Sequence, residues 1–448
     1  MTDTEGTASG RQGTAGTFGP GAGASATGRG LARRRRGRWV RWTGIGIAVL
    51  VVVAVGGGWA VYAKLDGNIT ADDAAADELA RYEKERPTSL VRDAQNILLI
   101  GSDSRAGDGN DRYGRDSGTE RSDTTILLHL SAGRHSATAV SLPRDLMVDV
   151  PGCRRPDGTR TAPMFAMFNS AFQVGGSACT IRTVEMLTDI RVDHHMVIDF
   201  HGFKDMVDAV DGVQVCLTAP IRDKAAKLRL PAGRVLLDGE QALGYVRARK
   251  SLGDGSDTDR MDRQQRFLGA LVHKVQSNDV LLNPARLYPV LDAATSSLTT
   301  DPDLASLRGL YQLVRGVRDI PAERVQFLTV PRESYVYNAN RDQLVEPEAQ
   351  KLFAQLRADA PVVVTKGAAA HSTAKSRDST AGAEKNSYES GNGMSYEQSY
   401  DYGAYGKGYP NGVRRGTGSA GKQSDEPTAA TSPAPTFRGN NAADDTCG

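Results

Sequence analysis

The sequence predicts an α/β/α-type sandwich with a mixed central sheet, preceded by one transmembrane helix. Residues 43–63 carry no charge, and at ~1.5 Å per residue this run can cross a ~30 Å hydrocarbon core. Short apolar runs typical of buried strands then alternate with helical patterns through the middle of the chain. Both ends of the chain are instead rich in glycine and small polar residues, which bury too little apolar surface to fold alone.

The first 42 residues are predicted to be a disordered, basic cytoplasmic tail. Six arginines between Arg33 and Arg41 stand directly before the apolar run. The positive-inside rule therefore places residues 1–42 in the cytoplasm and the residues after the run outside the cell. A signal peptide is the alternative, but signal h-regions are shorter and no small-residue cleavage site is evident. We expect a single retained anchor in the cell membrane.

The chain beyond the anchor divides into three predicted segments. Residues 64–90 look like a charged helical stalk that ends at Pro87, and residues 91–360 contain most of the apolar core material. Residues 361–448 are Ser, Gly, Lys, Thr and Pro punctuated by tyrosines, which predicts a disordered tail.

Strands and helices alternate within residues 91–360. Strands are predicted for NILLIG, TTILLHL, ATAVSL, HHMVIDF, VQVCL and RVQFLTV. Helices are predicted for SACTIRTVEMLTDI, HGFKDMVDAV, DGEQALGYVRAR and DRMDRQQRFLGALVHKV, and around 303–317 and 346–357.

The four cysteines suit an extracytoplasmic domain. In an oxidising compartment Cys153 and Cys179 could pair across a loop, although all the cysteines being unpaired stays open. Cys216, in the apolar run VQVCL, is predicted to be a buried free thiol, and Cys447 stands at the end of the chain. No CxxC or His/Cys spacing indicates zinc.

Charge and motif content exclude several classes of function. The 55 Lys and Arg residues nearly balance the 53 Asp and Glu residues, so a bulk nucleic-acid binder is not indicated. Residues 91–360 contain no Walker A loop, no GxGxxG, no HExxH and no GxSxG. An anion site would therefore have to be built from arginines and a metal ion.

Polar residues at strand ends supply the first candidates for such a site. Asp103 and Arg105 follow the strand NILLI in the loop GSDSR, and Arg121 and Asp123 precede the strand TTILLHL. Two carboxylates together with phosphate oxygens suit Mg²⁺. Arg144 follows a third strand in SLPRD. Taken one by one, an Asx turn or a surface salt bridge is the simpler explanation.

A second group of candidates stands near two predicted helices. Arg247 and Arg249 belong to YVRARK, and Arg260 and Gln264 share a helix face because they are four residues apart. An arginine-rich helix end is usually just solvated. Six arginines together with two aspartates instead indicate a phosphate-binding site, because guanidinium groups bind phosphate oxygens bidentately and stay charged at any working pH.

With these residues in place, the chain strongly resembles the LytR–CpsA–Psr family of cell-wall glycopolymer transferases. The matching segments lie in family order between Asn96 and Phe267. They are NILLIGSDSR, RSDTTILLHL, AVSLPRDLMVDVPG, FNSAFQVGG, VDHHMVIDFHGFKDMVDAVDGVQVC, LPAGRVLLDGEQALGYVRARK and DTDRMDRQQRF. The resemblance implies that residues 91–360 are the catalytic domain and that its apolar interior takes a polyprenyl tail.

The resemblance also implies roles for individual residues. Asp103 and Asp123 match carboxylates that hold Mg²⁺ (or Mn²⁺). The residues that match the pyrophosphate-binding set are Arg121, Arg144, Arg247, Arg249, Arg260 and Gln264, with Arg105 as a further candidate. From these positions we predict Asp103, Arg121 and Arg247 as the catalytic group, with Asp103 as a candidate proton acceptor.

The implied reaction is phosphoryl transfer from a polyprenyl-pyrophosphoryl glycan to a peptidoglycan hydroxyl. A hydrolase acting on the same lipid, a membrane-anchored regulator and a lipid-binding module without catalysis are the alternatives. Residues 1–32 show no helical pattern for a DNA-binding motif, and we expect no nucleic-acid partner. The glycan stays open, although the Ala, Gly and Arg-rich composition favours an actinobacterial polymer such as arabinogalactan.

Overall fold

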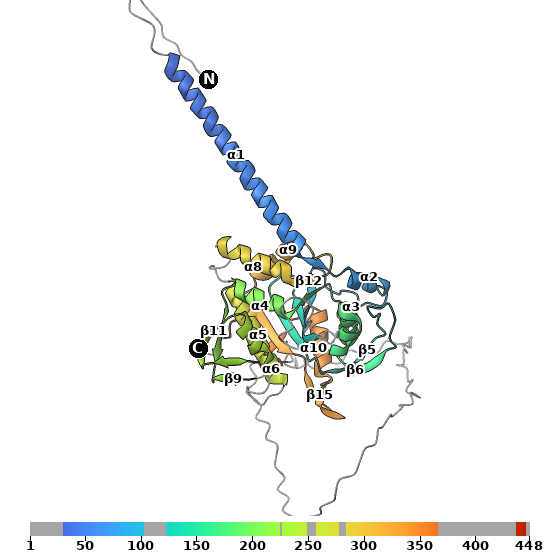
Figure 1. Ribbon diagram of the computed structural model, residues 1–448. Coiled ribbons are helices and arrows are strands. Elements are labelled where there is room, and N and C mark those ends of the chain that lie inside the picture. The colour runs from blue at the N-terminus through green and yellow to red at the C-terminus, as the bar shows by residue number, and fades with distance from the viewer. Residues whose placement is uncertain are drawn as a thin grey trace, which may run out of the picture.

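The computed structural model describes six stretches of the chain, and their arrangement is shown in Figure 1. The described residues are 30–102, 122–224, 226–248, 257–276, 284–365 and 436–444. A long helix rises from one end of an α/β domain in this view.

A mixed β-sheet forms the centre of the domain, as the sequence predicts. Among the described residues it contains β1 Thr70–Ala71, β2 Gln95–Ser102, β3 Ser122–Leu130, β4 Ala137–Leu142, β7 His194–Ile198, β12 Leu298–Thr300, β13 Val325–Thr329, β16 Val363–Thr365 and β17 Thr436–Asn441. Their order is β1-β12-β7-β2-β3-β4-β13-β17-β16. β2 runs antiparallel to β3 and parallel to β7, which makes the sheet mixed.

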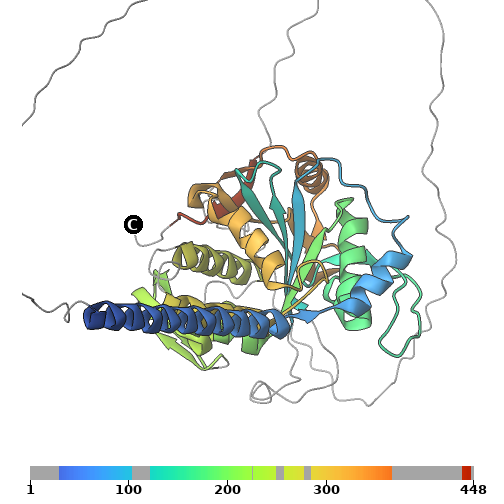
Figure 2. The same cartoon turned by 90° about the horizontal axis from the view of Figure 1, so that it is seen from above.

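Both faces of the sheet are covered, which explains the continuous apolar runs of its strands. Along β2, Ile97 and Leu98 point to opposite faces and belong to different hydrophobic clusters. The helices are α2 Asp73–Arg81, α3 Asn169–Thr188, α4 Phe200–Ala209, α5 Gly239–Arg247, α6 Asp257–Gln276, α8 Pro284–Ser297, α9 Leu307–Arg318 and α10 Glu348–Arg357. α2, α3 and α10 cover one face, whereas α6 and α9 cover the other and α4, α5 and α8 extend that layer (Figure 2).

Short two-stranded pairs join these layers. Their strands are β5 Met147–Val150, β6 Met164–Met167, β8 Val213–Leu217, β9 Ile221–Asp223, β10 Leu228–Leu230, β11 Gly233–Leu237, β14 Arg332–Tyr335 and β15 Asn338–Leu344. The pairs are β5 with β6, β8 with β11, β9 with β10 and β14 with β15, all antiparallel.

The long helix α1 (Gly30–Asn68) contains the predicted anchor. Its segment Arg41–Asn68 is long and apolar enough to cross a membrane. The most apolar part of this segment is not buried, whereas its end packs against the domain, where Leu65 is buried and α1 contacts α8. The helix begins well before the predicted span, so the predicted disorder of residues 1–42 is wrong from Gly30 onward. Arginine is a strong helix former, so the basic block continues the apolar helix instead of interrupting it.

The predicted stalk over residues 64–90 belongs to the domain instead. β1 pairs with β12 and so becomes an edge of the sheet, and α2 contacts α3. Further on, the Arg86 guanidinium donates to the buried Glu185 carboxylate, with Nη2 and Oε1 2.8 Å apart, and also to the Val192 carbonyl. A charged segment therefore buries its charges in specific pairs, which its composition does not reveal.

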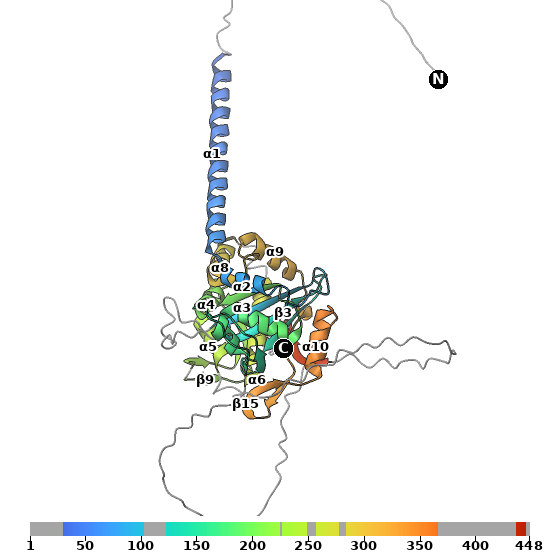
Figure 3. The ribbon, with the colours of Figure 1, turned by 90° about the vertical axis from the view of Figure 1, so that its right-hand side faces the viewer.

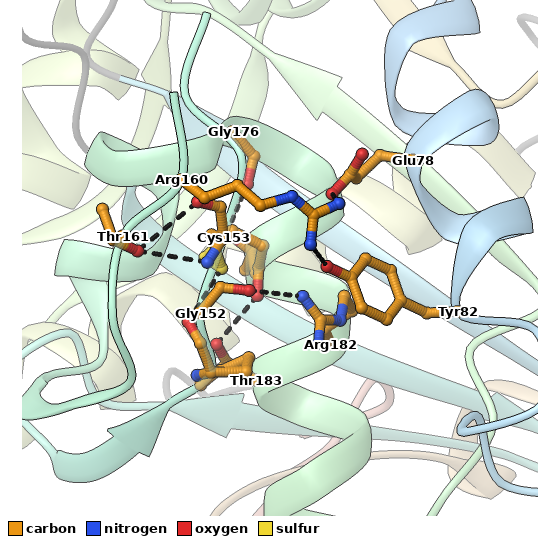
Figure 4. The surroundings of a disulfide bond; sticks show 12 residues. Glu78, Tyr82, Gly152, Cys153, Arg160, Thr161, Gly176, Arg182 and Thr183 are labelled. Carbon is orange, nitrogen blue, oxygen red and sulfur yellow. Dashed lines mark hydrogen bonds and ion pairs between the residues drawn. A yellow bond between two sulfur atoms is a disulfide. The ribbon is translucent and has the colours of Figure 1, made fainter. Parts of the chain in front are cut away.

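Cys153 and Cys179, whose pairing the sequence leaves open, form a disulfide bond. The disulfide joins the loop after β5 to α3 and is buried in the cluster beneath the sheet. Around it, Arg182 donates to the Gly152 carbonyl over 2.7 Å and lies 3.5 Å from the centroid of the Tyr82 ring (Figure 4). The disulfide region is thereby joined to the segment after α2.

Two adjacent glycines shape α3 beside the disulfide: Gly175 leaves space for close packing, and Gly176 provides a left-handed backbone conformation. A Cβ atom at Gly175 would lie 2.9 Å from Cys179 Cβ and 2.9 Å from the Arg154 carbonyl oxygen, closer than side chains tolerate. Gly176 has φ of +59°, a left-handed conformation that favours glycine, and α3 is kinked at this pair. The FQVGG segment is therefore explained by close packing against a crosslink.

Two predictions for the rest of the chain are wrong. Cys216 is disulfide-bonded and not a free thiol, because its position in an apolar run says nothing about a distant partner. The predicted disordered tail 361–448 is wrong for β16 and β17, which extend the sheet beside β13. The intervening residues 366–435 lie outside the described part of the chain.

Candidate functional site

A cavity of about 560 Å³ lies between one end of the sheet and the helices α4, α5 and α6. Most of its wall is apolar. The apolar side chains that line it include Leu99, Ile126, Ile198, Phe200, Phe203, Leu243, Val246, Phe267 and Leu268. These residues come from β2, β3, β7 and the three helices, so the cavity is a gap between the sheet and one helical layer. Such a site suits a ligand with a substantial apolar part.

Asp123 and Arg144 add charge to this wall. Asp123 stands near the start of β3 and Arg144 two residues after the end of β4. The antiparallel register of these strands brings the two ends together. Arg144 Nη1 donates to Asp123 Oδ1 over 2.7 Å, and Arg144 Nε donates to Asp145 Oδ2 over 3.3 Å. The carboxylate predicted at the start of one strand therefore lies against the cation predicted at the end of the next.

Arg247 reaches the same cavity from the last turn of α5. Asp238 caps the start of this helix, where its carboxylate accepts from Gln241 N and the Gln241 side chain bonds back. The Arg247 guanidinium lies 4.3 Å from the centroid of the Phe200 ring at the start of α4. This distance suits a cation–π contact, which holds the charge at the cavity wall.

The helix α6 contributes Arg260 and Gln264, which share a face as predicted. Both line the cavity, and Arg260 is only 5% exposed. Gln264 Nε2 donates to the Val246 carbonyl over 3.2 Å, which ties α6 to α5. One residue further on, Gln265 Nε2 donates to Ser141 and Thr329, so the same helix is also tied to the sheet.

The predicted site residues thus fall into two groups. The residues that line this one cavity are Asp123, Arg144, Arg247, Arg260 and Gln264. The predicted residues that lie outside the described part of the chain are Asp103, Arg105, Arg121 and Arg249. The chain leaves the sheet after Ser102 and returns at Ser122, and these two are register partners at the cavity end of β2 and β3.

Sequence reasoning missed several residues of the cavity wall. Asp199 accepts from Gly202 N over 2.8 Å and caps α4, although HHMVIDF reads as an uninterrupted strand. An aspartate followed by a helical pattern is an N-cap signal that could have placed Phe200 on a helix. Asp223, in the short β9–β10 pair, also lines the cavity and has no motif that could have revealed it.

A buried tyrosine stands beside this site. Burial raises the pKa of Tyr245 on α5, while the charges of Arg266 and Arg263 oppose the shift without cancelling it. Tyr245 therefore stays neutral at physiological pH, and its side chain packs in a hydrophobic cluster of buried residues.

Comparison with known proteins decides the family. The LytR_cpsA_psr family model matches residues 62–358, which include the whole cavity wall. The chain belongs to the LytR_cpsA_psr family. The match begins before the domain boundary predicted from the sequence, in agreement with the place of β1 and α2 in the fold.

Relatives of known name lie within this LytR_cpsA_psr family. The chain is 39% identical over 232 residues to the probable cell wall biosynthesis protein LcpB of Corynebacterium glutamicum, covering 50% of this chain and 53% of LcpB. It is 28% identical over 298 residues to the polyisoprenyl-teichoic acid–peptidoglycan teichoic acid transferase TagV of Bacillus subtilis, covering 64% and 71%. The matched part therefore spans about half the length of LcpB.

A solved structure is similar as well. The LytR-Csp2A-Psr enzyme from Actinomyces oris aligns with a TM-score of 0.48 and 21% identity, covering 60% of this chain and 93% of that one.

Proposed function

We propose that this chain transfers a glycan phosphate from a polyprenyl-pyrophosphoryl carrier onto peptidoglycan. The observation that carries the proposal is the single cavity that joins a wide apolar wall to Asp123, Arg144, Arg247 and Arg260. A lipid-linked pyrophosphate has the same two parts, an apolar chain and a compact anion. The arginines would bind the pyrophosphate oxygens while the apolar wall receives the first part of the chain.

The proposed reaction is a displacement at phosphorus. An acceptor hydroxyl forms a new P–O bond to the glycan-side phosphate, and the bond from that phosphorus to the bridging oxygen breaks. Polyprenyl phosphate leaves with the electron pair. Arg144, Arg247 and Arg260 would neutralise charge on the equatorial and leaving oxygens, which is the main catalytic task in phosphoryl transfer. The hydroxyl proton needs an acceptor, and Asp103 stays our prediction for that role.

The predicted metal ion fits the chemistry of Asp123. Within the described residues, no three His, Cys, Asp or Glu side chains form a metal-binding group. Mg²⁺ is commonly held by one or two carboxylates together with substrate phosphates, so one carboxylate at the cavity wall suits that mode of binding. We propose that Asp123 and Asp103 hold Mg²⁺ (or Mn²⁺). When bound, the ion would add positive charge beside the pyrophosphate.

The proposal includes a place in the cell. α1 would anchor the chain as a single span, with residues before it in the cytoplasm and the domain outside. The disulfide between Cys153 and Cys179 supports this orientation, because disulfides persist in oxidising compartments. We propose a polyprenyl-linked glycan and peptidoglycan as partners, and no nucleic acid. The similarity to TagV, a polyisoprenyl-teichoic acid–peptidoglycan teichoic acid transferase, supports this class of donor and acceptor without identifying the glycan that this chain uses.

The test is an acceptor-dependent transfer assay with the full chain in detergent or nanodiscs. The full chain is needed because a fragment that ends at residue 360 would lack β16 and β17. The chain is mixed with a polyprenyl-pyrophosphoryl saccharide, peptidoglycan oligomers and Mg²⁺, and products are followed by mass spectrometry. We expect a phosphodiester-linked adduct that is lost with EDTA and reduced at least ~100-fold by Arg247→Ala, the size of one removed charge-stabilising donor.

Matched controls separate the other functions. Arg229→Ala removes an exposed arginine on β10 that does not line the cavity, and it should transfer at the wild-type rate. Saccharide phosphate released without adduct would support the hydrolase. Lipid bound without any turnover would support the non-catalytic module or the regulator. Either result would contradict the transferase.

A further inference from the structure

An exposed aromatic surface lies at the end of the domain opposite α1. It consists of Phe165 on β6, Tyr335 at the end of β14 and the two loop residues Val336 and Tyr337, and we name it the aromatic platform. Val336 and Tyr337 are 72% and 85% exposed. The Tyr335 ring centroid lies 6.1 Å from that of Phe165 and 5.4 Å from that of Tyr337. Figures 1 and 3 show β15 projecting from the far end of the domain, away from α1, α8 and α9.

The identity of the loop residues is unexpected for folding. Tyr335 and Asn338 are register partners, so Val336 and Tyr337 form a two-residue hairpin loop. Neither residue has a positive φ, so the backbone of this loop accepts a side chain of any kind. The large side chains of Val336 and Tyr337 gain little from burial, so folding alone does not account for them.

The hairpin that carries the platform is held in shape by side-chain bonds. Gln343 Nε2 donates to Glu333 Oε1 over 2.8 Å, and Gln343 Oε1 accepts from Val336 N over 3.3 Å. Arg332 pairs with Asp342 near the base of the hairpin. The aromatic rings are therefore presented on a braced hairpin, and their ordering costs little on binding.

The base of this hairpin is joined to the cavity through Asp145. Asp342 N donates to the Asp145 carbonyl over 3.1 Å, and Arg341 Nη1 donates to Asp145 Oδ1 over 3.1 Å. The other carboxylate oxygen of Asp145 accepts from Arg144, which lines the cavity. Tyr337 directly precedes β15, four residues before Arg341 in the sequence, and the register of the hairpin shifts between Ser334 and Tyr335.

We propose that the aromatic platform binds the sugar rings of the acceptor glycan, an N-acetylated amino-sugar polymer, and directs its hydroxyl towards the cavity. The inference rests on the proposed transferase function. The apolar C–H faces of sugar rings stack on exposed aromatic rings, and the exposed amides of Asn338 and Asn340 stand beside them for hydroxyl and acetamido groups. A membrane is the wrong partner, because its surface meets the domain at the α1 end. With α1 spanning the membrane as proposed, the platform faces away from the membrane, where the cell wall would lie.

The experiment measures saccharide binding without any lipid donor. Full-length chain in nanodiscs is titrated calorimetrically with a defined N-acetylglucosamine–N-acetylmuramic acid oligosaccharide. We expect Tyr337→Ala to weaken binding about tenfold, in line with the loss of one or more ring contacts, and Tyr337→Trp to keep it. Tyr311→Ala is the matched control, because Tyr311 is 63% exposed on α9 at the α1 end. It should bind as the wild type does.

Each outcome bears on the inference separately from the transferase. Unchanged binding by Tyr337→Ala, or an equal loss in Tyr311→Ala, would overturn the platform even if transfer proceeds. Wild-type binding that is lost with Tyr337→Ala, in a chain that transfers nothing, would refute the transferase and leave the platform standing. If transfer occurs, Tyr337→Ala should raise the acceptor KM and leave kcat at saturating acceptor unchanged. A fall in kcat alone would contradict a binding role.

Discussion

Opening the Cys153–Cys179 disulfide should cost a predictable amount of stability. The two cysteines are 26 residues apart in sequence. The crosslink removes loop-closure entropy from the unfolded chain, and for a loop of this size the chain-entropy relation predicts about 3.5 kcal/mol at 25 °C. Cys153 and Cys179 are both buried. Alanine has no polar side-chain atom, so replacing them with alanine introduces no unsatisfied polar group. The loss should therefore mainly report the constraint on the unfolded state.

The assay is guanidinium-induced unfolding of the full chain in detergent, comparing wild type with the double variant Cys153→Ala/Cys179→Ala. We expect the midpoint to fall and the extrapolated free energy of unfolding to drop by about 3.5 kcal/mol. The slope should rise somewhat, because the unfolded chain without the crosslink exposes more surface. In thermal unfolding, the Tm of the double variant should lie roughly 7–14 °C below that of the wild type, at about 2–4 °C per kcal/mol. Adding a thiol reductant to the double variant is the control, because it opens only the disulfide of Cys216.

A loss below about 1 kcal/mol would refute the reasoning, because no plausible compensation in a buried site would hide a constraint of this size. A much larger loss, above about 5 kcal/mol, would show that α3 depends on the crosslink for its native packing. In that case the kink at Gly175 and Gly176, and not unfolded-chain entropy, would be the main contribution.

Two further predictions concern buried charges. Arg86→Ala should lower the free energy of unfolding by about 3–5 kcal/mol, because Glu185 would stay buried without its counter-charge. A chemical-unfolding loss under 1 kcal/mol would contradict this. Asp301→Asn should destabilise the chain most between pH 3.8 and 6.5. Burial lowers the pKa of His194, but the hydrogen bond and the charge of Asp301 outweigh burial, so the pKa of His194 is raised in the folded protein. The stabilisation that protonated His194 contributes is therefore lost as the pH rises through this raised pKa. Burial likewise raises the pKa of Asp301, but His194 outweighs it and lowers that pKa, so this stabilisation is lost as pH falls. The difference in Tm between wild type and Asp301→Asn is measured by thermal unfolding from pH 5 to 9. A difference that stays constant over this range would contradict the assignment.

Much of the fold could be predicted because its signals are local. Apolar runs such as NILLI belong to a sheet that is covered on both faces, and the 3.6-residue pattern of α6 shows which side faces the core. The errors occur where local pattern and tertiary role differ. The charged segment after α1 resembles a stalk because its buried partner, Glu185, is about 100 residues away.

The candidate site could be predicted residue by residue but not as a shape. Arginines and aspartates at strand ends indicated phosphate chemistry, and Asp123, Arg144 and Arg247 do share one cavity. Phe200, which holds the Arg247 guanidinium, was missed because a cation–π contact leaves no spacing in the sequence. The aromatic platform was missed for a related reason. Its members, Phe165 and Tyr335, are 170 residues apart and meet only through the fold.

The sequence by itself determined the long apolar helix, the mixed α/β class and the kinds of side chain in the site, because hydrophobic period and charge are properties of neighbouring residues. Only the tertiary structure decided which of these side chains meet. It also decided that the polar segment Thr436–Asn441 returns as a strand beside β13. A sheet edge recruits such a segment through backbone hydrogen bonds, which any residue except proline can make, so its sequence carries little sign of the partner.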